Sequence, residues 1–416
     1  MNANALSRIS AKAVALIQNE NTNLLLFLAF TIRIIWVLYF PVHPVSDYLW
    51  YYERALSISG GMGYSVNNIP TAYWPIGYPA FLGAIFYLFN NSILAAQLAN
   101  VLLDVASIFL IYKIALLLTS SKKIAGLSLL FFSLYLNHIA YCSLLSSEVL
   151  FLFLLLLAVY IFISNHNSVK SFVLFGLTIA AAVLVKPIIV LLPLVFLALK
   201  FNKKIQYILI TYSILLVALI PITVRNYNIY KEVFFVSLNS PVNLFIGNNP
   251  YSNGTYRYDE NVTGLIGNPT DEFTESKRAG EYAKKYILEN PGKSLSLIPK
   301  KIYYQYVNDV DGLSSCFVGI PDEYTLQKTI LIFLRWVSQL IYMMVVLLFL
   351  YKVYLKIRAH SMLKGIRGVC ALVLIYFFLM YLPFFGAPRF HYPMMPFVII
   401  KMFGWLNERR VALQQT

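Results

Sequence analysis

A single carboxylate, Asp47, follows the first long apolar run of the chain, residues 23–42. That run is long enough to cross a bilayer as a helix, which places Asp47 at a membrane boundary. An ionisable group in such a position is costly, so it is a functional-site hypothesis by default. A carboxylate held there could take the proton of a substrate hydroxyl. The alternative is structural, because Ser46 or Asp47 could simply cap the helix that begins here.

Few other acids compete for that role. Twelve of the eighteen carboxylates lie in the loop 225–327. Of the remaining six, only Asp47, Glu53 and Glu148 are expected at the same membrane face as the loop. Glu148 opens an apolar run, where it could cap helix N–H groups or pair with a cation.

Three cations form a second group of candidates: Lys186, Arg225 and Arg389. Lys186 precedes Pro187, and Arg225 and Arg389 also lie close to prolines at expected helix junctions. Converging cations of this kind suit a phosphate, with Arg giving bidentate contact and Lys a point charge. The alternative is that each side chain only reaches for lipid head groups.

The composition describes a protein of the membrane. Of 416 residues 59% are hydrophobic and only 12% are charged, which would leave a soluble fold with an apolar surface. Apolar runs of membrane-crossing length recur along the chain, and about ten transmembrane helices are expected. They fall near 23–42, 92–118, 124–140, 143–163, 169–185, 187–201, 205–224, 328–351, 368–385 and 391–407.

The net charge of +15 is explained by topology better than by nucleic-acid binding. The basic clusters fall in alternate short loops or at the end of the chain, which makes those loops cytoplasmic. Both termini are then expected inside, and the loops 43–91 and 225–327 outside. The clusters are Lys122-Lys123, Lys203-Lys204, the run 352–367 and Arg409-Arg410. A basic cytoplasmic face also favours anionic lipid head groups.

This topology divides the chain into three parts. Residues 1–224 form an N-terminal transmembrane module whose first external loop, 43–91, carries Asp47. We expect helices at 47–58 and 79–89, the second lying in the membrane interface. Residues 225–327 form a small external subdomain with helices at 271–289 and 294–307. Residues 328–416 contribute the C-terminal transmembrane helices.

Two polar stretches in the 225–327 loop could bind ligands. Residues 239–256 are dense in Asn and Gly, which make tight turns and can bind sugar hydroxyls. A surface loop without a ligand would have the same composition. Asp309-Val310-Asp311 has the pattern that binds divalent metals in soluble nucleotide-sugar enzymes, but no strand pattern surrounds it. His138, His391 and Glu148 show no ligand spacing, so metal use stays open.

Several of these stretches, in this order, resemble the lipid-linked-sugar transferases of glycosyltransferase family 39, in the GT-C superfamily. The family includes aminoarabinose lipid A transferase and protein O-mannosyltransferases. Many members have Arg at the position of Lys186. The segments that carry the resemblance are Arg33, Asp47-x-x-x-Tyr51-x-x-x-Ala55, Gly63-Tyr64, Tyr73-Trp74-Pro75-Ile76-Gly77-Tyr78-Pro79, Ser147-Glu148, Lys186-Pro187, Arg225-Asn226-Tyr227, Gly247-Asn248-Asn249-Pro250, Asn290-Pro291, and Arg389 with Pro393.

The resemblance implies an all-α polytopic GT-C fold and an inverting transferase at the outer face of the cytoplasmic membrane. The donor would be a polyprenyl-phosphate-linked sugar and the acceptor a hydroxyl of a glycan, lipid or protein. Asp47 would take the acceptor proton with Glu148 in support, and Lys186, Arg225 and Arg389 would hold the phosphate. No cofactor is required, and a divalent metal stays open. We expect a bacterial inner-membrane protein. Expected substrate contacts are Tyr51, Tyr73, Trp74, Tyr78, Asn248, His391 and Tyr392.

Two other functions fit parts of the pattern. A transporter or flippase for lipid-linked sugars would also need an outer cationic pocket, but it should show internal repeats, and none is evident. A polymerase or ligase of lipid-linked glycans would also carry a large outer loop with Arg and His. The position of Asp47 directly after the first helix favours the transferase.

Overall fold

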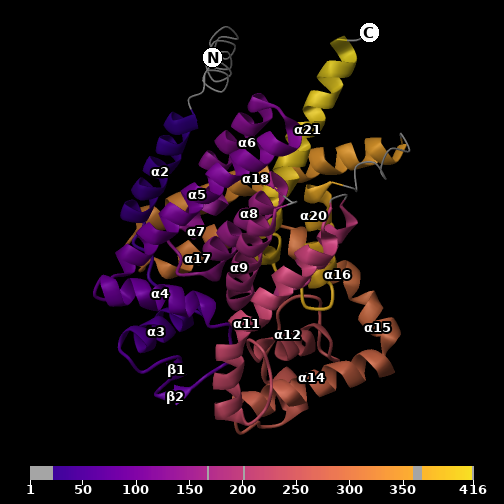
Figure 1. Ribbon diagram of the computed structural model, residues 1–416. Helices are drawn as coiled ribbons and strands as arrows, with labels where there is room; N and C mark the ends of the chain where they lie inside the picture. The colour runs from indigo at the N-terminus through magenta and orange to yellow at the C-terminus, as the bar shows by residue number, and fades with distance from the viewer. Residues whose placement is uncertain (1–21, 166–167, 200–201, 359–367, 415–416) are drawn as a thin grey trace.

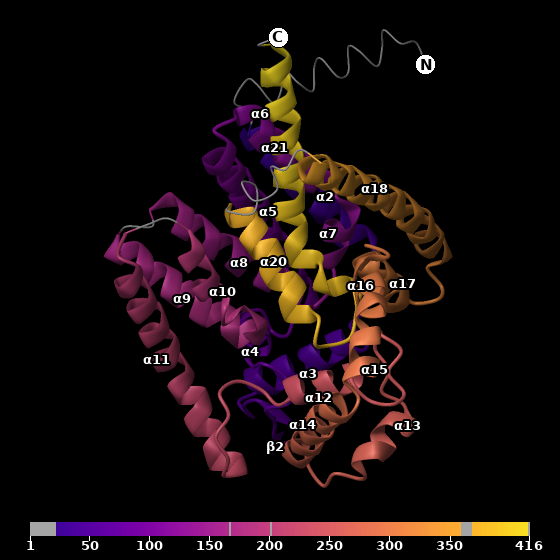
Figure 2. The same cartoon turned by 90° about the vertical axis from the view of Figure 1, so that its right-hand side faces the viewer.

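The computed structural model describes residues 22–165, 168–199, 202–358 and 368–414, with side chains as far as Trp405. Helices dominate this part of the chain (Figure 1). The only strands among the described residues are β1 (Ser65–Val66) and β2 (Ile69–Pro70), which pair antiparallel as a short hairpin. The hairpin lies at the opposite end of the molecule from α6 and the end of α21 (Figures 1 and 2).

Among the described residues, five helices are long and apolar enough to cross a membrane. Shorter apolar helices accompany them, which confirms an all-α polytopic membrane fold. The five are α2 (Thr22–Tyr39), α5 (Ile93–Thr119), α8 (Ser147–Ser164), α11 (Lys204–Tyr230) and α18 (Thr325–Arg358). The shorter ones are α4 (Gly77–Leu88), α9 (Val169–Val185), the run Pro187–Ala198 and α20 (Val369–Tyr381).

Two of the expected spans are interrupted. The described part of the run 187–201 is divided into η1 (Pro187–Ile189), α10 (Leu192–Val195) and η2 (Phe196–Ala198), because Pro193 lacks the N–H that a continuous helix needs. The run 124–140 divides at Tyr135, which is extended between α6 (Lys122–Leu134) and α7 (Leu136–Tyr141). The total of ten spans therefore stays a prediction.

A buried ion pair joins the first two long helices. The Arg33 guanidinium in α2 lies 2.5 Å from the Asp104 carboxylate in α5, and both side chains are buried. Arg33 also donates to the carbonyl oxygens of Phe132 at 2.9 Å and Ser133 at 3.1 Å, where α6 ends. Breaking one partner of such a pair would leave a buried charge uncompensated, so the pair specifies how these helices meet.

The first loop folds as two packed helices. α3 (Asp47–Ser59) and α4 confirm the helices expected near 47–58 and 79–89. They approach closely at Gly83, where an added Cβ would lie 2.7 Å from the Ile58 side chain. The chain between α3 and α4 carries the β1–β2 hairpin. The first residue of α3 is Asp47 itself, so the packing of this helix pair fixes where that carboxylate stands.

The 225–327 region, here called the loop subdomain, is built from short helices around a small apolar core. α14 begins as its acidic first turn predicts, with the Asp271 side chain accepting from the N–H groups of Phe273 and Thr274 at 2.9 Å. The helix expected at 294–307 is two helices that meet at Leu297, before Pro299. The helices are α12 (Asn239–Gly247), α13 (Glu260–Thr263), η3 (Gly264–Ile266), α14 (Glu272–Glu289), α15 (Pro291–Ser296), α16 (Ile298–Tyr306) and α17 (Asp311–Gly319).

After α20 the chain crosses the loop subdomain before it returns through η4 (Pro388–Phe390), η5 (Tyr392–Met394) and α21 (Met395–Gln414). Phe385 enters the apolar core of the loop subdomain. The Gly386 N–H donates to the Gly254 carbonyl at 2.8 Å. A Cβ on Gly386 would lie 2.1 Å from the Lys301 carbonyl oxygen, so only glycine fits there. These contacts hold the segment that carries Arg389.

Candidate active site

Asp47 does not serve as a helix cap. The N-cap residue of α3 is Ser46, whose side chain makes no cap hydrogen bond. Asp47 instead forms an ion pair with Arg389, with 2.5 Å between its Oδ2 and the guanidinium. Ser46 adopts a φ of 51°, which a residue with a side chain rarely takes and which costs roughly 1–3 kcal/mol. The Asp47 carboxylate is therefore engaged by a distant segment of the chain.

Arg389 is positioned by rings on either side of it in the chain. η4 begins at Pro388, and the Phe390 ring stacks on Tyr381 with centroids 4.4 Å apart and planes 7° apart. Burial lowers the pKa of the guanidinium, but Asp47, Glu148 and Asp311 raise it well above its ordinary value. The side chain is nevertheless partly exposed, so a ligand can reach it.

A second ion pair lies in the same region. Lys186 Nζ is 2.7 Å from Glu148 Oε1; Glu148 is 6% exposed and Lys186 21% exposed. Lys186 occupies an extended position between α9 and η1, and Glu148 lies in the first turn of α8. Tyr51 of α3 donates to Ser147 Oγ at 3.4 Å, which ties the helix that begins with Asp47 to the start of α8. The structure thus brings Asp47, Glu148, Lys186 and Arg389 together.

Aromatic side chains of the first loop stand beside these charges. Tyr51 contacts Trp74 and Tyr78 at centroid distances of 5.2 and 5.1 Å, and Trp50 contacts Trp74 at 4.6 Å. Tyr73 extends this group, because its ring lies 6.3 Å from that of Trp74 and also packs on the core of the loop subdomain. Flat aromatic faces next to charged groups suit a sugar ring, which presents both C–H and hydroxyl surfaces.

Arg225 occupies a different place from the other two cations. Its guanidinium donates to the carbonyl oxygens of Tyr64 at 2.7 Å and Thr71 at 3.0 Å, on either side of the β1–β2 hairpin. These contacts fix the hairpin to the end of α11. Its side chain is only partly buried and also lies over the Tyr64 ring, with the guanidinium carbon 5.5 Å from the centroid.

Three expected substrate residues lie in buried contacts. Asn248 donates to the Pro383 carbonyl at 2.7 Å, and its Oδ1 accepts from Lys301 at 3.2 Å. His391 places Nδ1 2.7 Å from the Gln305 carbonyl and Nε2 3.2 Å from Asp309. Tyr392 stacks on His138 with centroids 4.1 Å apart. All three support the segment around Arg389.

The Asp309-Val310-Asp311 triplet is split between two environments. Asp309 is buried and accepts from Tyr135 and Asn137; burial raises its pKa, but its contact with His391 holds the value below the ordinary range. Asp311 accepts from Tyr141 at 2.8 Å, and burial raises its pKa. Across the described residues no three His, Cys, Asp or Glu side chains gather as metal ligands.

Asp311 lies beside the expected site residues, although the sequence offers it only as part of a possible metal-binding triplet. It lies close enough to Arg389 and Glu148 for their charges to act on its pKa. Tyr256 is a second such neighbour: burial raises its pKa, Asp47 raises it further and Arg389 lowers it. Its ring packs on Phe385 at 5.3 Å. Both residues come from the loop subdomain, and only long-range folding brings them to Asp47.

Comparison with known proteins supports the class that this architecture suggests. Residues 74–225 match the family described as dolichyl-phosphate-mannose-protein mannosyltransferase. With the membrane-length helices, this match supports a membrane glycosyltransferase of the GT-C type. The matched range includes Glu148, Lys186 and Arg225, whereas Asp47 and Arg389 lie outside it. No curated protein and no solved structure matches the chain.

Proposed function

We propose that the chain is an inverting glycosyltransferase that moves a sugar from a polyprenyl-phosphate donor to a hydroxyl acceptor at the outer face of the cytoplasmic membrane. The observation that carries the proposal is the Asp47–Arg389 ion pair beside the Glu148–Lys186 pair. One base and two cations suffice for this reaction, because phosphate leaves readily without being protonated.

In the proposed reaction Asp47 takes the proton of the acceptor hydroxyl as its oxygen attacks the anomeric carbon of the sugar. The bond between that carbon and the phosphate oxygen breaks on the opposite face, so the configuration inverts. The electron pair leaves with the lipid phosphate, whose charge Arg389 and Lys186 stabilise. The aromatic side chains Tyr51, Trp74 and Tyr78 contact the sugar, and Glu148 orients Lys186.

The ion pairs predict the order in which the donor and the acceptor bind. Asp47 pairs with the guanidinium that the donor phosphate would contact. A phosphate that binds Arg389 competes with Asp47 for its N–H groups, and the displaced carboxylate becomes available to the acceptor. Donor binding therefore comes first and prepares the base.

Replacing Asp47 with Asn tests the proposal, because Asn keeps the shape and loses the basicity. The purified protein should still bind a polyprenyl-phosphate sugar, and transfer of a labelled sugar should fall by a factor on the order of 10² or more. Glu53→Gln is the matched control: it changes an acid on the same helix that is exposed and paired with Arg54 at 3.2 Å. Near-normal transfer by folded Asp47→Asn protein would refute the base assignment. Movement of the lipid-linked sugar across vesicles without transfer would favour the flippase.

A further inference from the structure

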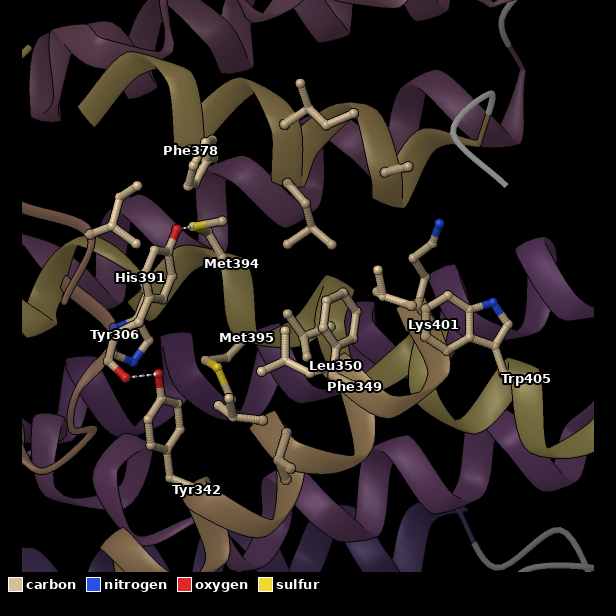
Figure 3. A pocket seen from close by; sticks show the side chains of 18 of the residues that line it. Tyr306, Tyr342, Phe349, Leu350, Phe378, His391, Met394, Met395, Lys401 and Trp405 are labelled. Carbon is tan, nitrogen blue, oxygen red and sulfur yellow. Dashed lines mark hydrogen bonds between the residues drawn. The ribbon is translucent and has the colours of Figure 1, made fainter. Parts of the chain in front are cut away.

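An elongated apolar cavity of about 530 Å³ lies between α16, α18, α20 and α21 (Figure 3). Of the proposed site residues only His391 lines it, so the cavity is separate from the Asp47 region. Its volume lies within the range of roughly 300–1,000 Å³ that small-molecule sites show. Figure 2 shows α18 and α20 on opposite sides of α21.

The cavity reaches the surface of the membrane helices. Leu350 of α18 and Ile375 of α20 both line it, and they are 56% and 39% exposed. These two helices are expected to face lipid, so the opening gives a hydrocarbon chain direct entry from the bilayer. Phe349 and Met395 line the middle of the cavity, and Phe378 and Met394 lie nearer to Tyr306 (Figure 3). The flexible Met side chains can adapt to a bent chain.

The two ends of the cavity differ in chemistry. Tyr306, Tyr342 and His391 close one end, where Tyr342 donates to the Tyr306 carbonyl at 2.9 Å and Tyr306 to Met394 Sδ at 3.4 Å. At the other end, Lys356 and Lys401 line the cavity. Both ammonium groups lie over the Trp405 ring, at 5.4 and 5.6 Å from its centroid.

The positions of the lysines identify the membrane leaflet. Lys356 lies in the last turn of α18, within the basic run 352–367 that the charge pattern places in the cytoplasm. A basic pocket between membrane helices on this side attracts the head groups of anionic lipids, and an indole ring is favoured at the head-group level. The glycosyl donor would be expected in the opposite orientation, with its phosphate toward the outer face, because that phosphate must reach Lys186 and Arg389.

We propose that this cavity binds an anionic phospholipid of the cytoplasmic leaflet, with a hydrocarbon chain between α18, α20 and α21 and the phosphate at Lys356 and Lys401. The chain end then contacts Met394 and His391, the residues that follow Arg389. A lipid in this position would fill space behind the segment that carries the proposed donor cation. The site does not depend on the proposed transferase reaction.

The test uses the full chain in neutral detergent, titrated separately with phosphatidylglycerol and with phosphatidylcholine of the same acyl chains. Native mass spectrometry measures bound lipid, and thermal unfolding measures its effect. We expect phosphatidylglycerol to bind more tightly and to raise Tm more. Because each lysine near a membrane surface contributes a factor of roughly 5, Lys356→Ala with Lys401→Ala should weaken binding about 30-fold. Lys170→Ala is the control, since Lys170 is an exposed lysine expected at the same face.

A second variant tests the contribution of the apolar lining separately from that of the two lysines. Ala371→Phe would fill part of the lining without changing charge, and it should reduce binding of both lipids while the protein stays folded. Equal binding of the two lipids, or full binding by the double lysine variant, would overturn the proposal. So would displacement of phosphatidylglycerol by an equimolar polyprenyl phosphate, because the cavity would then belong to the donor. None of these outcomes depends on glycosyl transfer.

Discussion

Arg389 and Asp47 stand 342 residues apart in the chain, and their side chains meet at 2.5 Å. The contact joins the start of α3 to the segment between α20 and α21. The proposed base and the proposed phosphate-binding cation therefore pair with each other. This arrangement keeps two partly buried charges satisfied, and it makes the exchange of one anion for another part of the proposed reaction.

Arg389→Ala should weaken use of the donor more than it affects the acceptor. Removing a charge-assisted contact to phosphate costs about 1.5–3 kcal/mol, so KM for a polyprenyl-phosphate sugar should rise by roughly 10- to 100-fold. Steady-state kinetics at saturating acceptor measures this. Arg335→Ala is a control arginine elsewhere in the protein, in α18. An unchanged donor KM would leave Arg389 as a residue that only pairs with Asp47.

Glu148 and Lys186 should act as one unit. If Glu148 serves only to hold Lys186, Glu148→Gln and Lys186→Ala should each reduce transfer, and the double variant should lose little more than Lys186→Ala alone. The expected interaction free energy in this double-mutant cycle is about 0.5–3 kcal/mol. Additive losses would show that Glu148 contacts the substrate independently. Full activity of Glu148→Gln would return Glu148 to a structural role.

The sequence predicts the individual residues of the candidate site better than the contacts between them. Asp47, Glu148, Lys186 and Arg389 each stand at a helix end beside Pro or a polar turn, and that local signal is enough to select them. Asp311 carries no comparable signal, because its relation to Arg389 arises only when α17 packs on α7. Asp309-Val310-Asp311 resembles a metal-binding triplet but has no strand pattern around it, and the two carboxylates contact different partners.

Local patterns also leave the role of a polar side chain open. The cations Arg225 and Arg389 look alike in sequence, yet Arg225 donates to two backbone carbonyls of the hairpin region. The sequence predicts that Asn248 contacts the sugar, and in the structure its Oδ1 accepts from the Lys301 ammonium. Likewise, hydropathy finds the apolar run 187–201 but does not show that its prolines divide it. In each case tertiary contacts decide what the local sequence allows.

The orientation of the chain can be tested by cysteine labelling. Lys284 is exposed in the loop subdomain, expected outside, and Lys170 is exposed at the start of α9, expected inside. In intact cells an impermeant thiol reagent should label Lys284→Cys and leave Lys170→Cys unlabelled until the cells are opened. The native Cys142, Cys316 and Cys370 are buried, which keeps the background low. The reverse pattern would contradict the topology and the outer-face site.

The last prediction concerns Lys301, a buried lysine that holds the segment before Arg389. Its Nζ donates to Asn248 Oδ1 at 3.2 Å and to the carbonyl oxygens of Pro383 at 3.1 Å and Leu382 at 3.4 Å. All three acceptors are uncharged, and burial lowers the pKa of Lys301 to about 8 from the ordinary 10.5. Between these two values the unfolded chain binds more protons than the folded chain, so this lysine makes stability rise with pH.

Below about pH 8 both states are protonated, and the contribution of Lys301 to the pH dependence disappears. The Tm of the wild-type protein minus that of Lys301→Met should therefore increase from pH 7.5 to pH 9.5, by an amount corresponding to a free energy on the order of 1 kcal/mol. Lys300→Met, which changes the exposed neighbouring lysine, should show no such increase. Because all three proteins share the same tyrosines, subtracting the Tm of each variant from that of the wild type at each pH cancels the effect of tyrosine titration. If the Tm difference between wild type and Lys301→Met stays constant or falls from pH 7.5 to pH 9.5, Lys301 remains fully charged in the folded protein. Its ammonium would then be stabilised by more than the three neutral oxygens around it.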